Sequence, residues 1–131
     1  MTNKVMDFLA HDRFAALAGI KLVQVEAGYA VAEMKIEDKH LNAVGIVQGG
    51  ATFTLADYAF AAASNSSGFI ALGVNANITY FQAPRGKVLT AEAKEVHANS
   101  KLASYNVDIF DENKELVARF TGMVYKKKDR Y

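Results

Sequence analysis

The sequence contains no cysteine and a single proline, Pro84, in its 131 residues. The absence of cysteine excludes disulfide bonds, thiolate metal sites and a cysteine nucleophile, and it is typical of cytoplasmic proteins. Charge is scarce as well: between Leu41 and Pro84 the only charged side chain is Asp57, within a small, apolar, helix-patterned run. Burying an unpaired carboxylate is costly, so Asp57 is the first residue expected to have a chemical role.

An excess of charge of either sign is also missing. Lys and Arg number 15 and Asp and Glu 14, so the formal net charge is +1, which argues against nucleic acid or an anionic membrane as the main partner. The longest small and apolar run, Gly49 to Ala63, is shorter than the roughly 20 residues of a membrane-spanning helix. No secretion signal is expected, because Asp7, Asp12 and Arg13 interrupt any apolar core near the start. We therefore expect a cytoplasmic protein without a membrane partner.

Motifs for metals and for several common hydrolases are absent from the sequence. The three histidines, His11, His40 and His97, are far apart along the chain, and no acidic cluster accompanies them. There is no GxSxG nucleophile elbow and no GxxxxGK phosphate loop. Neither a metal nor a cofactor is predicted.

The spacing of apolar residues predicts helices and strands in one domain over residues 1–131. Helices are expected over Lys4 to Ala18 and Gly49 to Ser64. Strands are expected over residues 20–25, 30–36, 70–81, 88–97, 102–110 and 116–125. Such a pattern favours an α+β fold in which an antiparallel curved sheet wraps around the long helix. The basic end, with Lys126, Lys127, Lys128 and Arg130, is expected to be a solvated tail, with contact to an anionic ligand as the alternative.

The segment from Asn42 to Asp57 reads NAVGIVQGGATFTLAD. The segment contains an Asn, a Gly three residues later, a Gln directly before a glycine pair, and an acidic residue eight positions after the first glycine of that pair. These residues are Asn42, Gly45, Gln48, Gly49, Gly50 and Asp57. This pattern resembles the hotdog-fold acyl-CoA thioesterases of the phenylacetate-degradation (PaaI-like) type, in the 4-hydroxybenzoyl-CoA thioesterase superfamily. The resemblance extends to the strand ALGVNANITYFQAP and covers nearly the whole chain. It implies a hotdog fold and thioester hydrolysis.

The glycine pair and Asp57 also have a chemical rationale of their own. Backbone N–H groups at the start of a helix are unpaired and lie at the positive end of its dipole, so the Gly49 N–H is predicted to polarise the thioester carbonyl. The alternative is that Gly49 and Gly50 only permit a tight turn. Gly50 and Thr54 are expected to contact the substrate. Asp57 is expected to act as a general base or as a nucleophile, or else it is an exposed polar position on a buried helix.

Two amides complete the predicted site. Gln48 stands where many relatives carry His; it can bind the thioester or orient the loop, but it cannot act as an acid or base. Asn42 is expected to support the loop or to polarise the carbonyl, the alternative being an ordinary turn residue.

The resemblance also implies an assembly, because in related enzymes the site lies between two subunits. Asp57 of one chain would face the loop of another, in a homodimer or homotetramer. Arg85, Lys87 and Lys101 are candidates for binding the phosphates of coenzyme A, the favoured alternative for each being a plain surface charge.

The expected function is an acyl-CoA thioesterase that releases a free acid and coenzyme A, with an aryl or a medium-chain acyl group left open. Five aromatic residues could line an acyl pocket or could pack in the core: Phe53, Tyr58, Phe60, Tyr80 and Phe81. One alternative is a non-catalytic acyl-CoA-binding protein. The other is a hotdog hydratase or dehydratase, which the sequence disfavours because no His lies between Asn42 and Ser64.

Overall fold

The structure, a computed structural model, describes residues 2–131, and one long helix organises it. Helix α3 spans Gly49–Ser64, the bounds that the sequence predicts. Alanines and a few large anchors bury most of its surface, among them Leu55 and Phe60. One strip of small side chains stays open, at the three- and four-residue spacing of a single helix face. We call it the open stripe of α3, and it consists of Gly50, Thr54, Asp57, Ala61 and Ser64.

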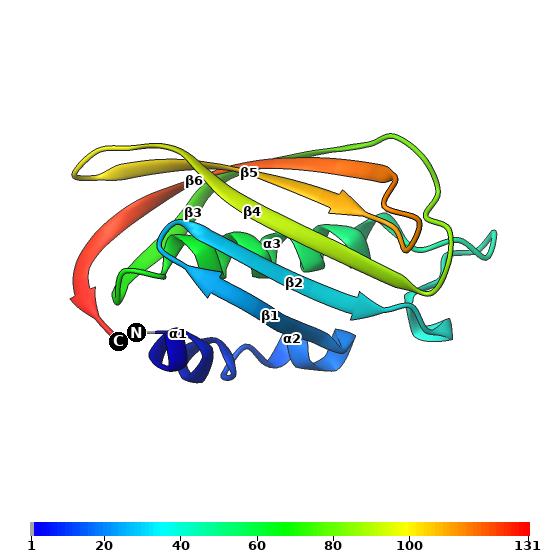
Figure 1. Cartoon of the computed structure of the whole chain (residues 1–131), viewed down its shortest axis with the longest axis horizontal. Coiled ribbons are helices and arrows are strands. Elements are labelled where there is room, and N and C mark those ends of the chain that lie inside the picture. Colours follow the sequence, from blue (N-terminus) through cyan, green and yellow to red (C-terminus); the bar gives the residue numbers. More distant parts are fainter. Residues whose placement is uncertain (1) are drawn as a thin grey trace.

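The sheet curves around α3, as Figure 1 shows. It has six strands, and neighbouring strands pair antiparallel. Their order across the sheet is β1-β2-β4-β5-β6-β3, so β1 and β3 form the two edges. The bounds are β1 Ile20–Glu26, β2 Tyr29–Lys35, β3 Phe69–Tyr80, β4 Val88–Ala98, β5 Leu102–Phe110 and β6 Leu116–Arg130. This is the hotdog architecture, and the predicted fold class is confirmed.

Glycine in the sheet allows α3 to approach it closely. A side chain at Gly122 in β6 would place its Cβ 2.7 Å from the Phe60 ring and 2.9 Å from the Phe120 ring, closer than real Cβ contacts. Both rings are buried, and their centroids lie 5.3 Å apart. The Phe60 and Phe120 pair therefore fixes the helix against the sheet.

The N-terminal segment differs from its prediction, because it forms two short helices rather than one. Helix α1 spans Thr2–Leu9 and α2 spans Arg13–Ala18. Asp12 causes the break, since its carboxylate accepts a hydrogen bond from the Ala15 N–H at 3.0 Å and starts α2 as its N-cap. Helix α1 is tied to α3 by the Tyr58 hydroxyl, which donates to the carbonyl of Leu9 at 3.3 Å.

The basic C-terminal residues also depart from their prediction. They are not a solvated tail, because β6 continues to Arg130 and pairs with β3 up to Phe69. The pairing passes from Ala71 opposite Lys126 to Phe69 opposite Arg130, so β6 has a bulge between these positions. Lys127 and Lys128 lie in this bulge.

Candidate active site

Asn42 closes the loop that leads into α3. Its side-chain oxygen accepts hydrogen bonds from the N–H groups of Val44 at 3.0 Å and Ile46 at 3.1 Å. The Asn42 N–H donates to the Ile46 carbonyl at 2.7 Å, and a β-bridge joins Leu41 to Val47. The side-chain oxygen thus builds the loop, while in residues 2–131 no acceptor binds the side-chain NH₂ group.

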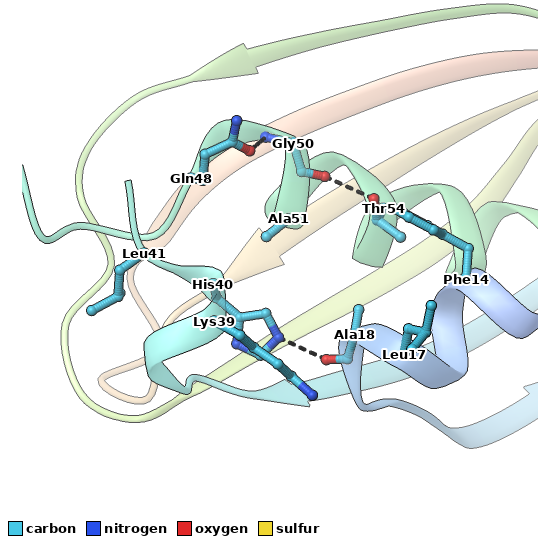
Figure 2. A pocket seen from close by; sticks show the side chains of 10 residues that line it. All are labelled: Phe14, Leu17, Ala18, Lys39, His40, Leu41, Gln48, Gly50, Ala51 and Thr54. Carbon is cyan, nitrogen blue, oxygen red and sulfur yellow. Dashed lines mark hydrogen bonds between the residues drawn. The ribbon is translucent and has the colours of Figure 1, made fainter. Parts of the chain in front are cut away.

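Gln48 is the N-cap of α3 and holds its first turn in place. Its backbone N–H donates to the His40 carbonyl at 2.7 Å, and its side-chain oxygen accepts a hydrogen bond from the Gly50 N–H, as Figure 2 shows. The Gly50 N–H is therefore occupied within the protomer. Thr54, one turn further on, donates its hydroxyl to the Gly50 carbonyl at 2.8 Å.

Replacing Gln48 with Ala should destabilise the start of α3. The Gly50 N–H would lose its acceptor, and loss of an N-cap costs about 1 kcal/mol of folding free energy. Urea unfolding of the variant should show this decrease, and Gln24→Ala at an exposed position of β1 is the matched control. Equal midpoints for the two variants would mean that the cap contributes nothing.

Gly49 has the free N–H that the sequence analysis predicts. Among the described residues no acceptor is bonded to it, whereas its carbonyl accepts a hydrogen bond from the Tyr80 hydroxyl at 2.8 Å. A Cβ at Gly49 would lie 3.0 Å from the Tyr80 ring and hydroxyl, so glycine permits this close approach. Tyr80 is the last residue of β3. The sequence analysis did not predict the contact between Tyr80 and Gly49. The two residues are 31 positions apart, so no local pattern indicates it.

Gly49 and Tyr80 line a pocket of about 350 Å³, which we call the β3 pocket. The end of β3 and the segment after it form one wall, with Phe81 and Pro84, and Val47 and Thr52 lie on the loop and helix side. Tyr80 and Phe81 are exposed at 49% and 53%, so these two predicted aromatic residues do line a hollow. Tyr58 and Phe60 are instead buried, and Phe53 packs edge-on against Phe120.

Asp57 lies at the centre of the open stripe and is exposed in the protomer. Within residues 2–131 its side chain makes no hydrogen bond and no ion pair. Although one side is open to solvent, the surrounding protein removes enough water that burial raises the pKa of Asp57, and the negative charge of Asp12 raises it further. A raised pKa and a missing partner are typical of a carboxylate used in chemistry.

A second hollow, which we call the α2–α3 groove, begins at the N-terminal end of the open stripe. It has a volume of about 510 Å³ and lies between α2, the loop after β2 and the first turns of α3 (Figure 2). Phe14 and Leu17 of α2 form one wall and are exposed at 66% and 72%. Gln48, Gly50 and Thr54 are on the opposite wall, so three predicted catalytic and binding positions meet an apolar surface here.

His40 borders this groove without being available for proton transfer. It ends a short 3₁₀ helix, Asp38–His40, and its side chain is buried. One ring nitrogen accepts the Glu37 N–H at 2.9 Å, and the other donates to the Ala18 carbonyl at 2.7 Å. Both nitrogens are thus used to join α2 to the loop.

The three predicted coenzyme A contacts do not lie together in one protomer. Arg85 and Lys87 precede β4, and their backbone N–H groups donate to Asp111 at 2.9 Å and Glu112 at 2.7 Å. Lys101 follows the other end of β4, roughly 35 Å away at about 3.3 Å per residue. All three side chains are exposed.

No group of three or more His, Asp or Glu side chains in the part of the chain that the structure describes is arranged to hold a metal ion.

None of the helices in residues 2–131 combines the length and the apolar character needed to cross a membrane.

Together, a curved sheet around one helix, a free N–H at the helix start and a carboxylate on its open stripe define the hotdog class of thioester hydrolases. Residues 44–118, more than half of the chain, match the thioesterase superfamily. The chain belongs to this superfamily, which confirms the resemblance seen in the sequence and the expected class of enzyme.

Individual relatives agree with this assignment. A protein of Archaeoglobus fulgidus whose name classes it among esterases is 39% identical over 96% of this chain and 83% of its own length. The acyl-coenzyme A thioesterase PaaI of Escherichia coli is 32% identical over 88% of this chain and 84% of its own length. The solved structure of the E. coli PaaI protein from the phenylacetic acid degradation operon superposes with a TM-score of 0.91, at 28% identity, covering 98% of this chain and 97% of that one.

Proposed function

We propose that this enzyme hydrolyses acyl-CoA thioesters to a free acid and coenzyme A, without a metal or another cofactor. Two groups at α3 carry the proposal: the Gly49 N–H at the start of the helix, which has no acceptor within residues 2–131, and the Asp57 carboxylate on the open stripe, which has no partner there either. The acyl-CoA thioesterase name of the E. coli relative supports this substrate class.

The chemistry requires that negative charge be stabilised on the thioester oxygen. When the carbonyl carbon is attacked, the Gly49 N–H and the helix dipole face the developing oxyanion; removing such a donor typically slows turnover by about 10²- to 10³-fold. Among the described residues no acceptor binds the side-chain NH₂ groups of Asn42 and Gln48, so they are further donors from the same loop. The carbon–sulfur bond then breaks, and coenzyme A leaves as a thiolate that takes up a proton.

Asp57 supplies the attacking group in one of two ways. As a general base it removes a proton from water, whose oxygen then bonds to the carbonyl carbon. As a nucleophile its own oxygen forms that bond, and water resolves the resulting anhydride. The hydratase alternative lacks a free imidazole here, because both His40 nitrogens are bonded to the backbone.

We further propose that each site is shared between two subunits of a cytoplasmic homodimer or homotetramer. Tyr80 at the end of the edge strand β3 holds Gly49, so the predicted oxyanion donor lies beside the strand edge where another chain can add. Asp57 is open to solvent in the protomer, where a second subunit can cover it. Both features support a site completed by association.

The α2–α3 groove is the part of the proposed site that fits an acyl group. Its apolar wall of Phe14 and Leu17 lies beside the helix start, and its 510 Å³ accommodate an aryl or a medium-chain acyl group.

Free-thiol release from a series of acyl-CoAs tests this function. Short, medium, long and aryl acyl groups should be compared at equal enzyme concentration. The expected result is that at least one acyl-CoA is hydrolysed in proportion to the enzyme added, at least about 10⁶-fold faster than without enzyme, the lower end of the usual range of rate enhancements. Binding of acyl-CoA without thiol release would instead identify a binding protein.

The acid limb of the pH–rate profile should depend on Asp12. Asp57 acts as a carboxylate, so activity is present above its pKa and is lost as the pH falls through it. Asp12→Asn removes a negative charge that raises the pKa of Asp57, and the limb should move to lower pH. Asparagine can still cap α2, which keeps the fold. Asp38→Asn, at an exposed position of the loop, is the control that should leave the profile unchanged.

A further inference from the structure

A pocket lined by lysines, serines and the apolar start of β3, Phe69 to Ala71, lies at the C-terminal end of α3. It has a volume of about 350 Å³, and we call it the lysine pocket. Ser64, the last residue of the open stripe, lines it together with Ser67 and Ser100, and Lys126, Lys127 and Lys128 of β6 form its basic wall. Hydroxyl and ammonium donors around a hollow are the chemistry that recognises phosphate.

The bulge in β6 places these lysines, so they are built into the sheet. The Lys126 ammonium donates to the Asn99 carbonyl at 3.0 Å, and its backbone N–H donates to the Lys101 carbonyl at 2.7 Å. Lys127 pairs with Asp129 at 3.3 Å. Lys128 makes no ion pair in the part of the chain that the structure describes. Strand pairing of Lys126 and Arg130, on either side of the bulge, thus fixes the segment that carries these three cationic side chains at one end of the molecule.

The balance of charge at this pocket is positive. Asp129 is one acidic neighbour, and Glu95, which lines an adjoining hollow with Lys126, accepts a hydrogen bond from the Tyr105 hydroxyl at 3.1 Å. The lysines are not needed to cap α3, because the Asn65 and Ser66 side chains bond its last carbonyls, those of Ala61 and Ala63. Lys126 and Lys127 each have one partner, Asn99 and Asp129, and Lys128 has none among the described residues, so the pocket keeps a net positive charge.

The open stripe connects this pocket to the proposed reaction centre. Asp57, Ala61 and Ser64 follow one another along one face of α3, and seven residues correspond to about 10 Å of helix. The small side chain of Ala61 leaves room between the two ends. The α2–α3 groove lies at the other end of the stripe, so a thioester at Asp57 would have its acyl group on one side and its coenzyme A arm on the other.

We propose that the lysine pocket binds the phosphate groups of the coenzyme A nucleotide, with Lys127 and Lys128 as binding residues. This inference rests on the proposed acyl-CoA substrate. It assigns the role to a different set of cations from Arg85 and Lys87, which lie near the opposite end of β4, beside the N-terminal end of α3.

Neutralising the two lysines tests the proposal. Lys127→Gln/Lys128→Gln should raise KM for an acyl-CoA at least tenfold at low ionic strength and leave kcat nearly unchanged, because the phosphates are bound equally in the ground and transition states. The same acyl group on N-acetylcysteamine carries no phosphate, and its kcat/KM should stay within twofold. Added salt should raise KM of the unmodified enzyme more than that of the variant. Lys21→Gln/Lys35→Gln, at exposed positions of β1 and β2 outside the pocket, is the matched control and should leave KM within twofold.

An unchanged KM for the acyl-CoA, or an equal loss with both substrates, would overturn the proposal. Calorimetric titration with coenzyme A decides the question independently of hydrolysis, so a failed thioesterase assay would refute only the proposed function. Coenzyme A should bind the unmodified protein at least tenfold more tightly than the double variant. Inorganic phosphate is the second probe. If it displaced coenzyme A when the two are present at equal concentration, the pocket would be a general phosphate site, and its assignment to the nucleotide would be wrong.

Discussion

Asp57→Asn is expected to lower kcat for acyl-CoA hydrolysis by about 10²- to 10⁴-fold, the usual contribution of a positioned acid or base. Asparagine has nearly the same shape but can neither remove a proton nor attack a thioester. Because the side chain is exposed and makes no hydrogen bond within residues 2–131, the fold should not change. Steady-state thiol release, with circular dichroism of both proteins, measures the two effects separately.

The control for this experiment is Asp38→Asn, which makes the same chemical change at an exposed position outside the open stripe. It should retain full activity. If the Asp57→Asn protein were folded, kept its oligomeric state and still had near-normal turnover, this carboxylate would have no role in the mechanism.

Disrupting the free edge of β3 is expected to abolish both assembly and activity. Leu72 and Val74 lie on this strand with 51% and 59% of their surface exposed. Leu72→Asp/Val74→Asp places two negative charges where a second chain would pack, and like charges from the partner would oppose association. Sedimentation should show monomers, and kcat should fall by about 10²- to 10³-fold, the effect of losing an oxyanion donor.

Val23→Asp provides the comparison at the opposite edge of the sheet. Val23 is 52% exposed on β1, so the substitution has the same chemistry at the other edge. It should leave the β3-dependent dimer and its activity in place. A stable and active monomer of the double variant would contradict the shared site.

Periodicity predicted the sheet and the central helix well, because burial alone decides them. The bounds of α3 follow from the glycine pair at one end and a polar run at the other. The prediction was wrong where a local side-chain bond competes with the helix. Asp12 resembles an ordinary polar residue of an amphipathic helix, yet its cap on Ala15 starts a new helix.

Long-range pairing explains the other differences. Lys126 to Arg130 look like a solvated tail in sequence, and only the partner strand β3 reveals that they are part of the sheet. The sequence proposes Arg85, Lys87 and Lys101 as separate phosphate contacts by their charge, and only the structure shows that the whole length of β4 lies between Lys101 and the other two. The contact of Tyr80 with Gly49 depends on where β3 ends relative to α3, which no local pattern encodes.

The bond between Tyr80 and Gly49 has a thermodynamic consequence for the proposed assembly. It attaches the backbone of the predicted oxyanion donor to the strand along which subunits would pair. A ligand that binds the Gly49 N–H then increases the association constant of the subunits. By reciprocity, association increases the affinity for that ligand by the same factor. Specific activity should accordingly decline on dilution and recover when substrate is present, so the enzyme would respond to its own concentration.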